Sequence, residues 1–380
     1  MTRYSFIEPL DVLFLRGNKL FGDPGSFGES LVPPWPSAAA GALRSWLLAE
    51  AGIDPAAFAR GEVAHPELGT PAAPGPFTVT AFHLARRIDG RIEALHAAPA
   101  DLLVFKDDDQ MAARLLRPVP PAAAIRTSAA TAQVAVLAAT ERRKPASGYW
   151  LNARAWAAYL TGRVPEVADL IPAADLWAID ARVGVGLDTE RRSAKEGHLF
   201  SAQAVALCDG SAPPGNVGRV GFLAGVDGAE LPVRGMLRLG GDGRAAALAA
   251  ADYAPPATDH AALARARRCR LVLSSPGIFA GGWRLPGMAD DGRFDFLGVR
   301  GRVVCAAVAR AEVVSGFDLA RWQPKPAERA APAGSVYWIE DLEGDAAALG
   351  KLAEHGLWPE SADNHSRRAE GFNRVTLAAY

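Results

Sequence analysis

The segment Arg182–Ala202, which reads RVGVGLDTERRSAKEGHLFSA, constrains the fold more than any other part of this 380-residue chain. It begins with apolar residues at alternate positions, separated by Gly184 and Gly186, and then turns abruptly polar. The alternation predicts a β-strand, and glycine inside a strand usually marks a bulge or a close approach of other atoms. The charged run cannot lie in a core, so the strand must lead into an exposed loop.

This charged run contains candidate ligand contacts. Basic side chains on an exposed loop suit contacts with nucleic-acid phosphates, and His198 suits a base or a ribose. By itself the pattern equally fits a solvated hairpin tip, with His198 as a packed or capping histidine. The candidate residues of this segment are Arg182, Arg191, Arg192, Lys195 and His198.

The composition excludes a globally basic nucleic-acid binder. The chain is 49% hydrophobic and 22% charged, as in folded globular proteins, and its formal net charge is −1. An RNA contact must therefore come from a local patch. The N-terminus has no apolar signal region and no apolar run is long enough to span a bilayer, so we expect a cytoplasmic protein without a membrane partner.

The three cysteines form neither a CxxC pair nor an even-numbered disulfide framework. Cys269 and Cys305 lie in apolar, strand-like runs, which predicts that both are small core residues. Cys208 lies far from either of them along the chain. This usage is typical of a reducing compartment.

Local signals predict mixed α and β structure in both halves of the chain. Asp89-Gly90 stands between two strand-like runs and predicts a tight hairpin. Ser37 and Asn152 are expected to cap helices, because their side-chain oxygens can accept from the free amides of a first turn. Other expected elements are a helix over Asp345–His355 stopped by Gly356, and strands over Ser5–Leu15, Leu176–Leu187 and Arg302–Val314.

Motifs in five regions of the chain together resemble CRISPR proteins of the RAMP superfamily, specifically the family of subunit three of the type III-B (Cmr) effector complex. No single motif is decisive, but their order along the chain is fairly specific. Residues Gly52–Arg143 match nothing in that family pattern. The motifs are PLDVLFLRG, GSFGES and PPWPSAAAGALRS within Ile7–Ser45, the central RVGVGLD…EGHLFS string, RLGGDGRA at Arg238–Ala245, SGFDLARWQPKPAERAAPAGSVYW at Ser315–Trp338, and EGFNRV at Glu370–Val375.

The resemblance implies an α+β fold of two ferredoxin-like (RRM-like) domains, each an antiparallel sheet with helices on one face. We place the first domain at residues 1–205, with an insertion near 101–145, and the second at residues 206–380. The resemblance also implies a non-catalytic subunit that holds the 5′ tag of the guide RNA. Its other partners would be the large polymerase-like subunit and a backbone RAMP subunit.

The glycine-rich stretch Gly17–Arg44 is the strongest ligand-site candidate on physical grounds. Glycines let backbone amides approach a ligand closely, and the first turn of the helix opened by Ser37 could receive a phosphate. Aromatic side chains such as Phe27 and Trp35 could stack on bases. A capped helix with a packed loop is the alternative. The candidates of this region are Arg16, Lys19, Phe27, Gly28, Ser37 and Arg44.

The second half offers weaker candidates. In GGDG, at Gly240–Gly243, Arg244 stands where a second carboxylate would be needed for two-metal chemistry, so a tight turn is the better interpretation. Prolines favour an extended segment around Lys325 and Arg329, and EGFNR resembles a reduced form of the RAMP glycine-rich loop. The candidates here are Arg244, Lys325, Arg329 and Arg374.

Catalytic arrangements are poor. The seven histidines show no metal-ligand spacing, and there is no P-loop, GxSxG or HExxH motif. We therefore expect no cofactor, no metal site and no enzymatic activity. Two alternatives remain open: a metal-independent endoribonuclease that processes precursor guide RNA with His198 as general base, as in other RAMP proteins, and an assembly subunit without direct RNA contact.

Overall fold

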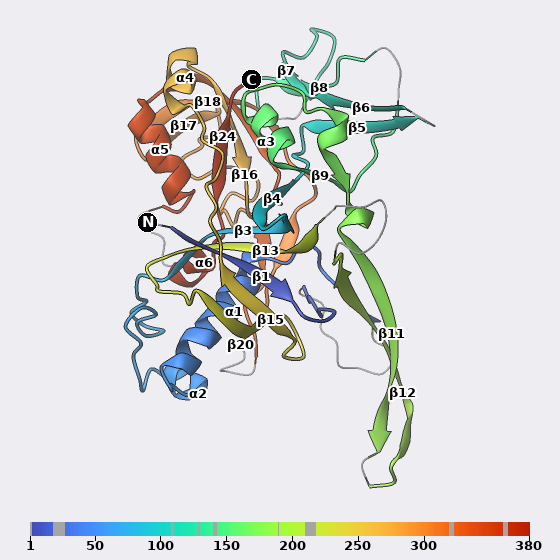
Figure 1. Ribbon diagram of the computed structural model, residues 1–380. Coiled ribbons are helices and arrows are strands. Elements are labelled where there is room, and N and C mark those ends of the chain that lie inside the picture. Colours follow the sequence, from blue (N-terminus) through green and yellow to red (C-terminus); the bar gives the residue numbers. More distant parts are fainter. Residues whose placement is uncertain are drawn as a thin grey trace. The chain divides into compact units, whose positions relative to one another are not determined.

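A computed structural model describes residues 2–17, 27–107, 110–127, 130–139, 143–188, 190–209, 218–318, 323–359 and 364–380 (Figure 1). The chain forms two compact units, and both are discontinuous in sequence. Unit 1 comprises Met1–Ile92, Ala174–Asp252 and Val313–Glu328; unit 2 comprises Glu93–Ala173, Tyr253–Glu312 and Arg329–Tyr380. These interleaved units differ from the contiguous division at residue 205, and the assignment of two RAMP domains stays a prediction.

Unit 1 is built on an antiparallel sheet with the strand order β14-β15-β1-β13-β3. Leu248, Ile7, Phe222 and Leu84 lie opposite one another on four neighbouring strands and are all buried, so they form one apolar row across the sheet. The helix α1 packs against β3 and β14. Bounds in this unit are β1 (Arg3–Pro9), β2 (Phe27–Gly28), α1 (Pro36–Glu50), α2 (Pro55–Ala59), β3 (Thr78–Ile88), β11 (Trp177–Asp188), β12 (Ser193–Leu207), β13 (Arg219–Asp227), β14 (Arg234–Arg238), β15 (Ala245–Ala250), β20 (Phe317–Asp318) and β21 (Gln323–Pro324).

Unit 2 contains a second antiparallel sheet with the order β17-β18-β23-β16-β24. Its bounds are α3 (Ala153–Leu160), α4 (His260–Ala266), β16 (Cys269–Leu273), β17 (Arg293–Phe296), β18 (Val299–Ala307), β23 (Val336–Glu343), α5 (Ala346–His355), α6 (His365–Ala369) and β24 (Val375–Ala378). The segment expected to be an insertion forms hairpins β5 (Leu102–Asp107)–β6 (Gln110–Leu115) and β7 (Arg117–Val119)–β8 (Val134–Val136). Elements at or near the unit boundaries are β4 (Arg91–Ala97), β9 (Tyr149–Leu151), β10 (Leu170–Pro172), β19 (Glu312–Val314) and β22 (Glu328–Ala330).

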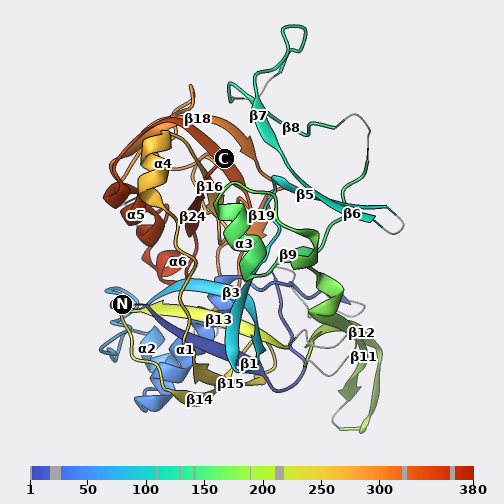
Figure 2. The same cartoon turned by 45° about the horizontal axis from the view of Figure 1, so that its top comes forward.

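The sheet of unit 2 is covered on both faces, which corrects the expectation of helices on one face. Leu271, Tyr337 and Ile339 pack into a core with residues of α4 and α5, whereas Val272 and Trp338 pack into another with residues of α3 and β5. Figure 2 shows α4 and α5 on one side of β16 and α3 on the other. Because side chains alternate along a strand, an all-apolar strand such as β16 fits a sheet buried on both faces.

Several local predictions are confirmed. Asp89 and Gly90 both have positive φ and join β3 to β4. Asn152 Oδ1 accepts from the Ala155 amide at 2.9 Å and caps α3. Burial raises the pKa of the Cys269 thiol to about 12 and that of Cys305 to about 11, in agreement with core positions.

Two expected strands are wrong in extent. The first ends at Pro9, and Leu13 pairs instead with Val205 of β12. The strand expected over Arg302–Val314 is divided into β18 and β19, with residues 308–311 between them. In unit 1 the described residues 228–244 form β14 and turns rather than a second helix, so ferredoxin-like topology stays a prediction as well.

A buried ion pair lies at the centre of unit 2. Arg270 Nη1 donates to Asp101 Oδ2 at 2.6 Å, Arg270 Nη2 to the Tyr159 carbonyl at 2.7 Å, and the Tyr159 hydroxyl to Asp101 Oδ1 at 2.8 Å. Burial raises the pKa of the Asp101 carboxyl, and the Arg270 guanidinium opposes that rise by stabilising the carboxylate. Burial and the Asp101 charge raise the pKa of Tyr159 well above its usual value, so its hydroxyl remains a donor.

We expect Arg270→Ala to destabilise the protein by about 3–5 kcal/mol, because it leaves the Asp101 carboxylate buried without its cation. Arg293→Ala is the matched control, since Arg293 pairs with Asp291 on the exposed surface and should change stability little. Urea unfolding followed by circular dichroism measures both. Equal losses for the two variants would contradict a central role for the buried pair.

Candidate RNA-binding surface

The strand predicted over Leu176–Leu187 is confirmed as β11, which spans Trp177–Asp188 and pairs with β12 in a long hairpin (Figure 1). Gly184 lies opposite Phe200, and a Cβ atom on Gly184 would stand 2.3 Å from the Phe200 ring. A Cβ atom on Gly186, at the register shift in the ladder, would stand 2.9 Å from the His198 Cβ atom. The two glycines therefore let the side chains of the opposite strand lie across the backbone of β11.

The hairpin tip presents its basic side chains to solvent. Asp188 Oδ1 accepts from the amides of Glu190 and Arg191, both at 3.0 Å, and Arg192 adopts a positive φ of 51°, which together set the turn. Arg191, Arg192 and Lys195 are exposed. The tip is not a purely basic patch, because Asp188, Glu190 and Glu196 balance these charges in number.

One face of the hairpin is apolar and exposed, a feature that the sequence interpretation missed. Val183 is 71% exposed, Leu187 67% and Leu199 59%, and Val185 pairs directly with Leu199. Their alternate spacing along two paired strands places them on the same face. Several large apolar side chains exposed together usually mark an interaction surface.

Four sequence-distant segments converge at the base of this hairpin, here called the hairpin base. Gly28 of β2 pairs in parallel with Ala202, and the Ser30 hydroxyl donates to the Gln203 carbonyl at 2.6 Å. The Leu13 and Val205 backbones exchange hydrogen bonds, and the Gly241 amide donates to the Phe14 carbonyl at 2.7 Å. The hairpin base thus comprises 13–16, 28–30, 201–205 and 240–244.

The arginines predicted near this base differ in their surroundings. Arg244 pairs with Asp11 at 2.7 Å and its guanidinium stacks over the Phe14 ring, and GGDG forms the expected tight turn before it. Arg182 pairs with Asp180 on the same strand. Arg16 is exposed, and its backbone bridges to Ser30. Arg244 and Arg182 therefore already hold carboxylate partners.

The prediction that Ser37 caps α1 is wrong. The helix begins at Pro36 and its N-cap is Trp35, which is almost buried and supplies no side-chain acceptor. Proline has no amide hydrogen and a φ suited to a first helical position, so it moves the start one residue earlier. Arg44 lies two turns further on, with its guanidinium over the Phe77 ring.

The remaining candidates lie elsewhere or outside the described residues. Lys325 is partly buried, and its backbone carbonyl accepts from Ser315 at 2.7 Å. In unit 2, Arg329 is exposed beside Trp283 in a cavity of about 480 Å³. Arg374 is only 8% exposed and donates to the Glu354 carbonyl, which corrects its assignment as a surface contact. Lys19 and the Phe27 side chain lie outside the described residues.

Among the described residues, no group of three or more His, Cys, Asp or Glu side chains could hold a metal ion. In the same part of the chain, no helix is long and apolar enough to cross a membrane. His198 makes no hydrogen bond to a residue that the structure describes, and it lies partly buried against Gly186.

Comparisons with known proteins agree with the sequence motifs. The family model described as CRISPR-associated protein (Cas_Cmr3) matches residues 5–378. A chain in a cryo-EM structure of Type III-B Cmr-beta bound to cognate target RNA and AMPPnP is 14% identical, with a TM-score of 0.49, and the match covers 98% of this chain and 96% of that one. A second Cmr-beta structure, bound to cognate target RNA, is also 14% identical, with a TM-score of 0.48 and coverage of 99% and 96%. No curated protein sequence matches.

The corrected start of α1 makes a prediction about stability. Ser37→Ala should leave the free energy of unfolding almost unchanged, because the hydroxyl does not cap the helix. Asn152→Ala, the matched control, should cost about 1 kcal/mol because it removes the observed cap of α3. Urea unfolding midpoints test the pair, and a loss at Ser37 as large as that at Asn152 would restore Ser37 as a structural cap.

Proposed function

The chain belongs to the Cas_Cmr3 family of CRISPR-associated proteins, and from this premise we propose that it is a non-catalytic, RNA-binding subunit of a type III-B ribonucleoprotein. In this role it holds the 5′ tag of the guide RNA. It also bridges the large polymerase-like subunit to the backbone RAMP subunits. Base pairing by the guide then supplies target specificity, as in other RNA-guided effectors.

The observation that carries this proposal is the hairpin base. Three of the motifs that resemble the family, from the N-terminal region, the central string and GGDG, lie side by side there although they are far apart in sequence. Glycines and exposed turns at this point let backbone amides approach a ligand, and Arg16 is exposed beside them. This arrangement supports an RNA backbone lying along the base of the hairpin.

The hairpin tip supports a contact further along the RNA. Arg191, Arg192 and Lys195 are exposed on a two-stranded ribbon, and cations of this kind contact phosphates without reading sequence. Because the tip also carries acidic residues, affinity must come from the placement of individual cations rather than from net charge. We therefore assign the tip a positioning role for the guide.

The apolar face of the hairpin supports the bridging role. Val183, Leu187 and Leu199 expose apolar side chains to water. Charged RNA phosphates gain nothing from contact with such side chains, whereas a protein partner would bury them. A ribbon with cations at its tip and apolar residues on one face can meet RNA and protein together. The proposed protein partner at this face is a backbone subunit.

The alternative function is metal-independent cleavage of precursor guide RNA with His198 as general base. A general base of this kind is normally oriented by a hydrogen-bonded partner. Among the described residues His198 has no hydrogen-bond partner, and this observation favours binding over cleavage. An assembly subunit without RNA contact is the third possibility, which the salt dependence below distinguishes.

We expect Arg191→Ala/Arg192→Ala to weaken binding of single-stranded guide RNA and to lower the log–log salt slope by about 1.4, because about 0.7 is lost for each phosphate contact removed. Fluorescence anisotropy across a salt series measures both quantities. The matched control is Arg91→Ala/Arg234→Ala, which removes the same charge from exposed sites elsewhere in unit 1. If both double variants give the wild-type slope, the hairpin tip is not in the RNA site.

The second experiment separates binding from catalysis. The purified wild-type chain should leave labelled precursor guide RNA intact, with and without divalent metal, and His198→Ala should bind RNA with little change. Denaturing gel electrophoresis detects any product. Metal-free cutting at one defined position, abolished by His198→Ala, would replace the binding proposal with the endoribonuclease.

A further inference from the structure

The sheet of unit 1 ends in an exposed edge strand, β14. This strand pairs with β15 on one side, and no other described strand pairs with it on the opposite side (Figure 2). It contains no proline, and its pairing with β15 has no register shift, so the usual devices that disrupt pairing at a sheet edge are missing from it. The backbone of β14 is therefore straight enough to accept a further strand.

The hydrogen bonds at the two ends of β14 show which of its backbone groups point outward. The Val233 carbonyl accepts from the Ala250 amide at 2.8 Å, and the Leu239 amide donates to the Arg244 carbonyl at 2.9 Å. Bonded and non-bonded pairs alternate along an antiparallel ladder, so the odd-numbered residues from 233 to 239 bond toward β15. The residues whose amides and carbonyls point away from β15, at the open edge, are Arg234, Met236 and Arg238.

The side chains of the same three residues lie on a solvent-exposed face of the sheet. Side chains alternate along a strand, and Leu237, on the opposite face, is buried on the side where α1 packs against β14. Met236 is 53% exposed, and Arg234 and Arg238 are exposed on either side of it. The open edge therefore presents a cation, an apolar side chain and a second cation at alternate positions.

The neighbouring strand β15 continues this face with small apolar side chains. Ala245, Ala247 and Ala249 lie on the same face as Met236, and none of the three is buried. Leu10, whose amide donates to the Ala245 carbonyl at 3.1 Å, is 57% exposed. Apolar side chains exposed together usually mark an interaction surface, so a protein that adds a strand to β14 can also cover these side chains.

The two arginines select the charge of the partner. A second copy that paired antiparallel through the same strand, centred on Met236, would place Arg234 of each copy opposite Arg238 of the other, and like charges directly opposite are destabilising. Residues 218–252, which include β14 and both flanking turns, are all described, and neither arginine has an ion-pair partner among the described residues of the chain. An acidic strand satisfies both cations, whereas a second copy is repelled.

We propose that β14 is a docking edge for an extended acidic segment of a partner protein, which adds to the sheet of unit 1 as one more strand. The register requires two carboxylates four positions apart, opposite Arg234 and Arg238, with an apolar residue midway against Met236. Backbone hydrogen bonds to the outward groups hold the segment, and its alternate side chains give specificity. This inference does not depend on the RNA-binding function proposed above.

The test uses the full chain and a fluorescein-labelled peptide, Thr-Glu-Val-Leu-Val-Glu-Thr, which carries the required pattern. Arg234→Glu/Arg238→Glu should weaken binding of this peptide by roughly tenfold or more, because two cross-strand attractions become repulsions. The same variant should gain binding of the peptide in which lysines replace both glutamates, which shows that the variant is folded. Arg60→Glu/Arg91→Glu is the matched control, since it makes the same charge change at exposed sites elsewhere in unit 1. Fluorescence anisotropy measures all four combinations.

A second peptide, N-methylated at alternate residues, tests the added strand itself. Loss of binding is expected, because the methyl groups remove the donors that face β14. Equal binding of the methylated peptide would reduce the contact to charge alone and overturn the docking edge, as would equal binding of the acidic peptide by the β14 variant and its control. If the β14 variant instead loses guide RNA and keeps the acidic peptide, the two arginines belong to the RNA surface and the docking edge is wrong, while the proposed function stands. The peptide assay contains no RNA, so failure of the RNA-binding function leaves its result unchanged.

Discussion

The buried Arg270–Asp101 pair is the interaction on which the rest of unit 2 depends. A guanidinium and a carboxylate withdrawn from water cost several kcal/mol each unless every donor and acceptor is satisfied. Here the Tyr159 hydroxyl and carbonyl and the Ala379 carbonyl complete the set. The pair therefore fixes β16, α3, the chain terminus and the start of the 101–145 segment at one point.

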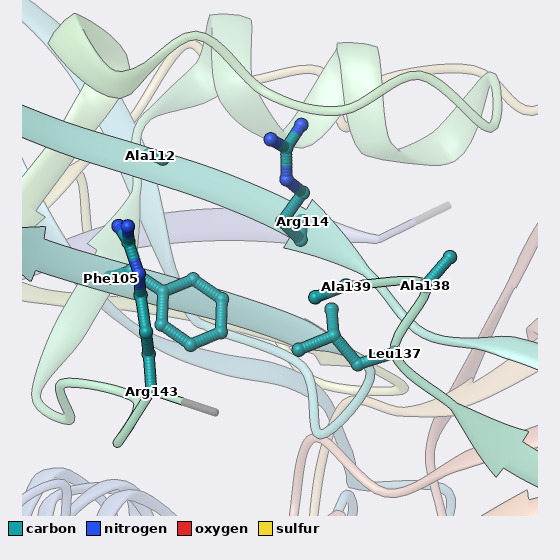
Figure 3. A pocket seen from close by; sticks show the side chains of 7 residues that line it. All are labelled: Phe105, Ala112, Arg114, Leu137, Ala138, Ala139 and Arg143. Atoms are coloured by element: carbon teal, nitrogen blue, oxygen red, sulfur yellow. The ribbon is translucent and has the colours of Figure 1, made fainter. Parts of the chain in front are cut away.

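The 101–145 segment is attached to the core of unit 2 at this point. It was expected to be an insertion, and its first hairpin contributes Leu102 and Val104 to the core of unit 2, with Asp101 as its anchor. A hairpin with one buried face must present its other face outward or to a cavity. The same register that buries Val104 in the core turns Phe105 and Arg114 to the other face (Figure 3), where Phe105 is still buried and Arg114 is exposed.

The hairpin of unit 1 is held in place by backbone hydrogen bonds rather than by a buried ion pair. It projects from a base held by backbone hydrogen bonds between segments that are distant in sequence, such as Leu13 with Val205. Backbone hydrogen bonds do not depend on which side chains the strands carry. The same two-stranded ribbon can therefore carry cations at its tip and apolar residues on one face. The proposed roles in RNA positioning and in subunit contact arise from this division of one element.

The sequence alone determined the features that depend on near neighbours. Asp89-Gly90 forms a turn, Asn152 caps a helix, and Gly184 leaves room for the Phe200 ring. In each case the partner lies in the same turn or on the opposite strand of one hairpin. The family could also be identified from the sequence, because the order of its motifs along the chain can be read without knowing which residues are in contact.

Only the tertiary structure decided what each arginine does. Arg270, Arg244 and Arg191 are the same residue type, yet one lies in the core against Asp101, one pairs with Asp11, and one faces solvent. Asp101 and Arg270 are 169 positions apart, so no local pattern identifies them as partners. The electrostatic free energy of a charged side chain depends on its burial and on its nearest opposite charge, and both are set by how distant segments pack.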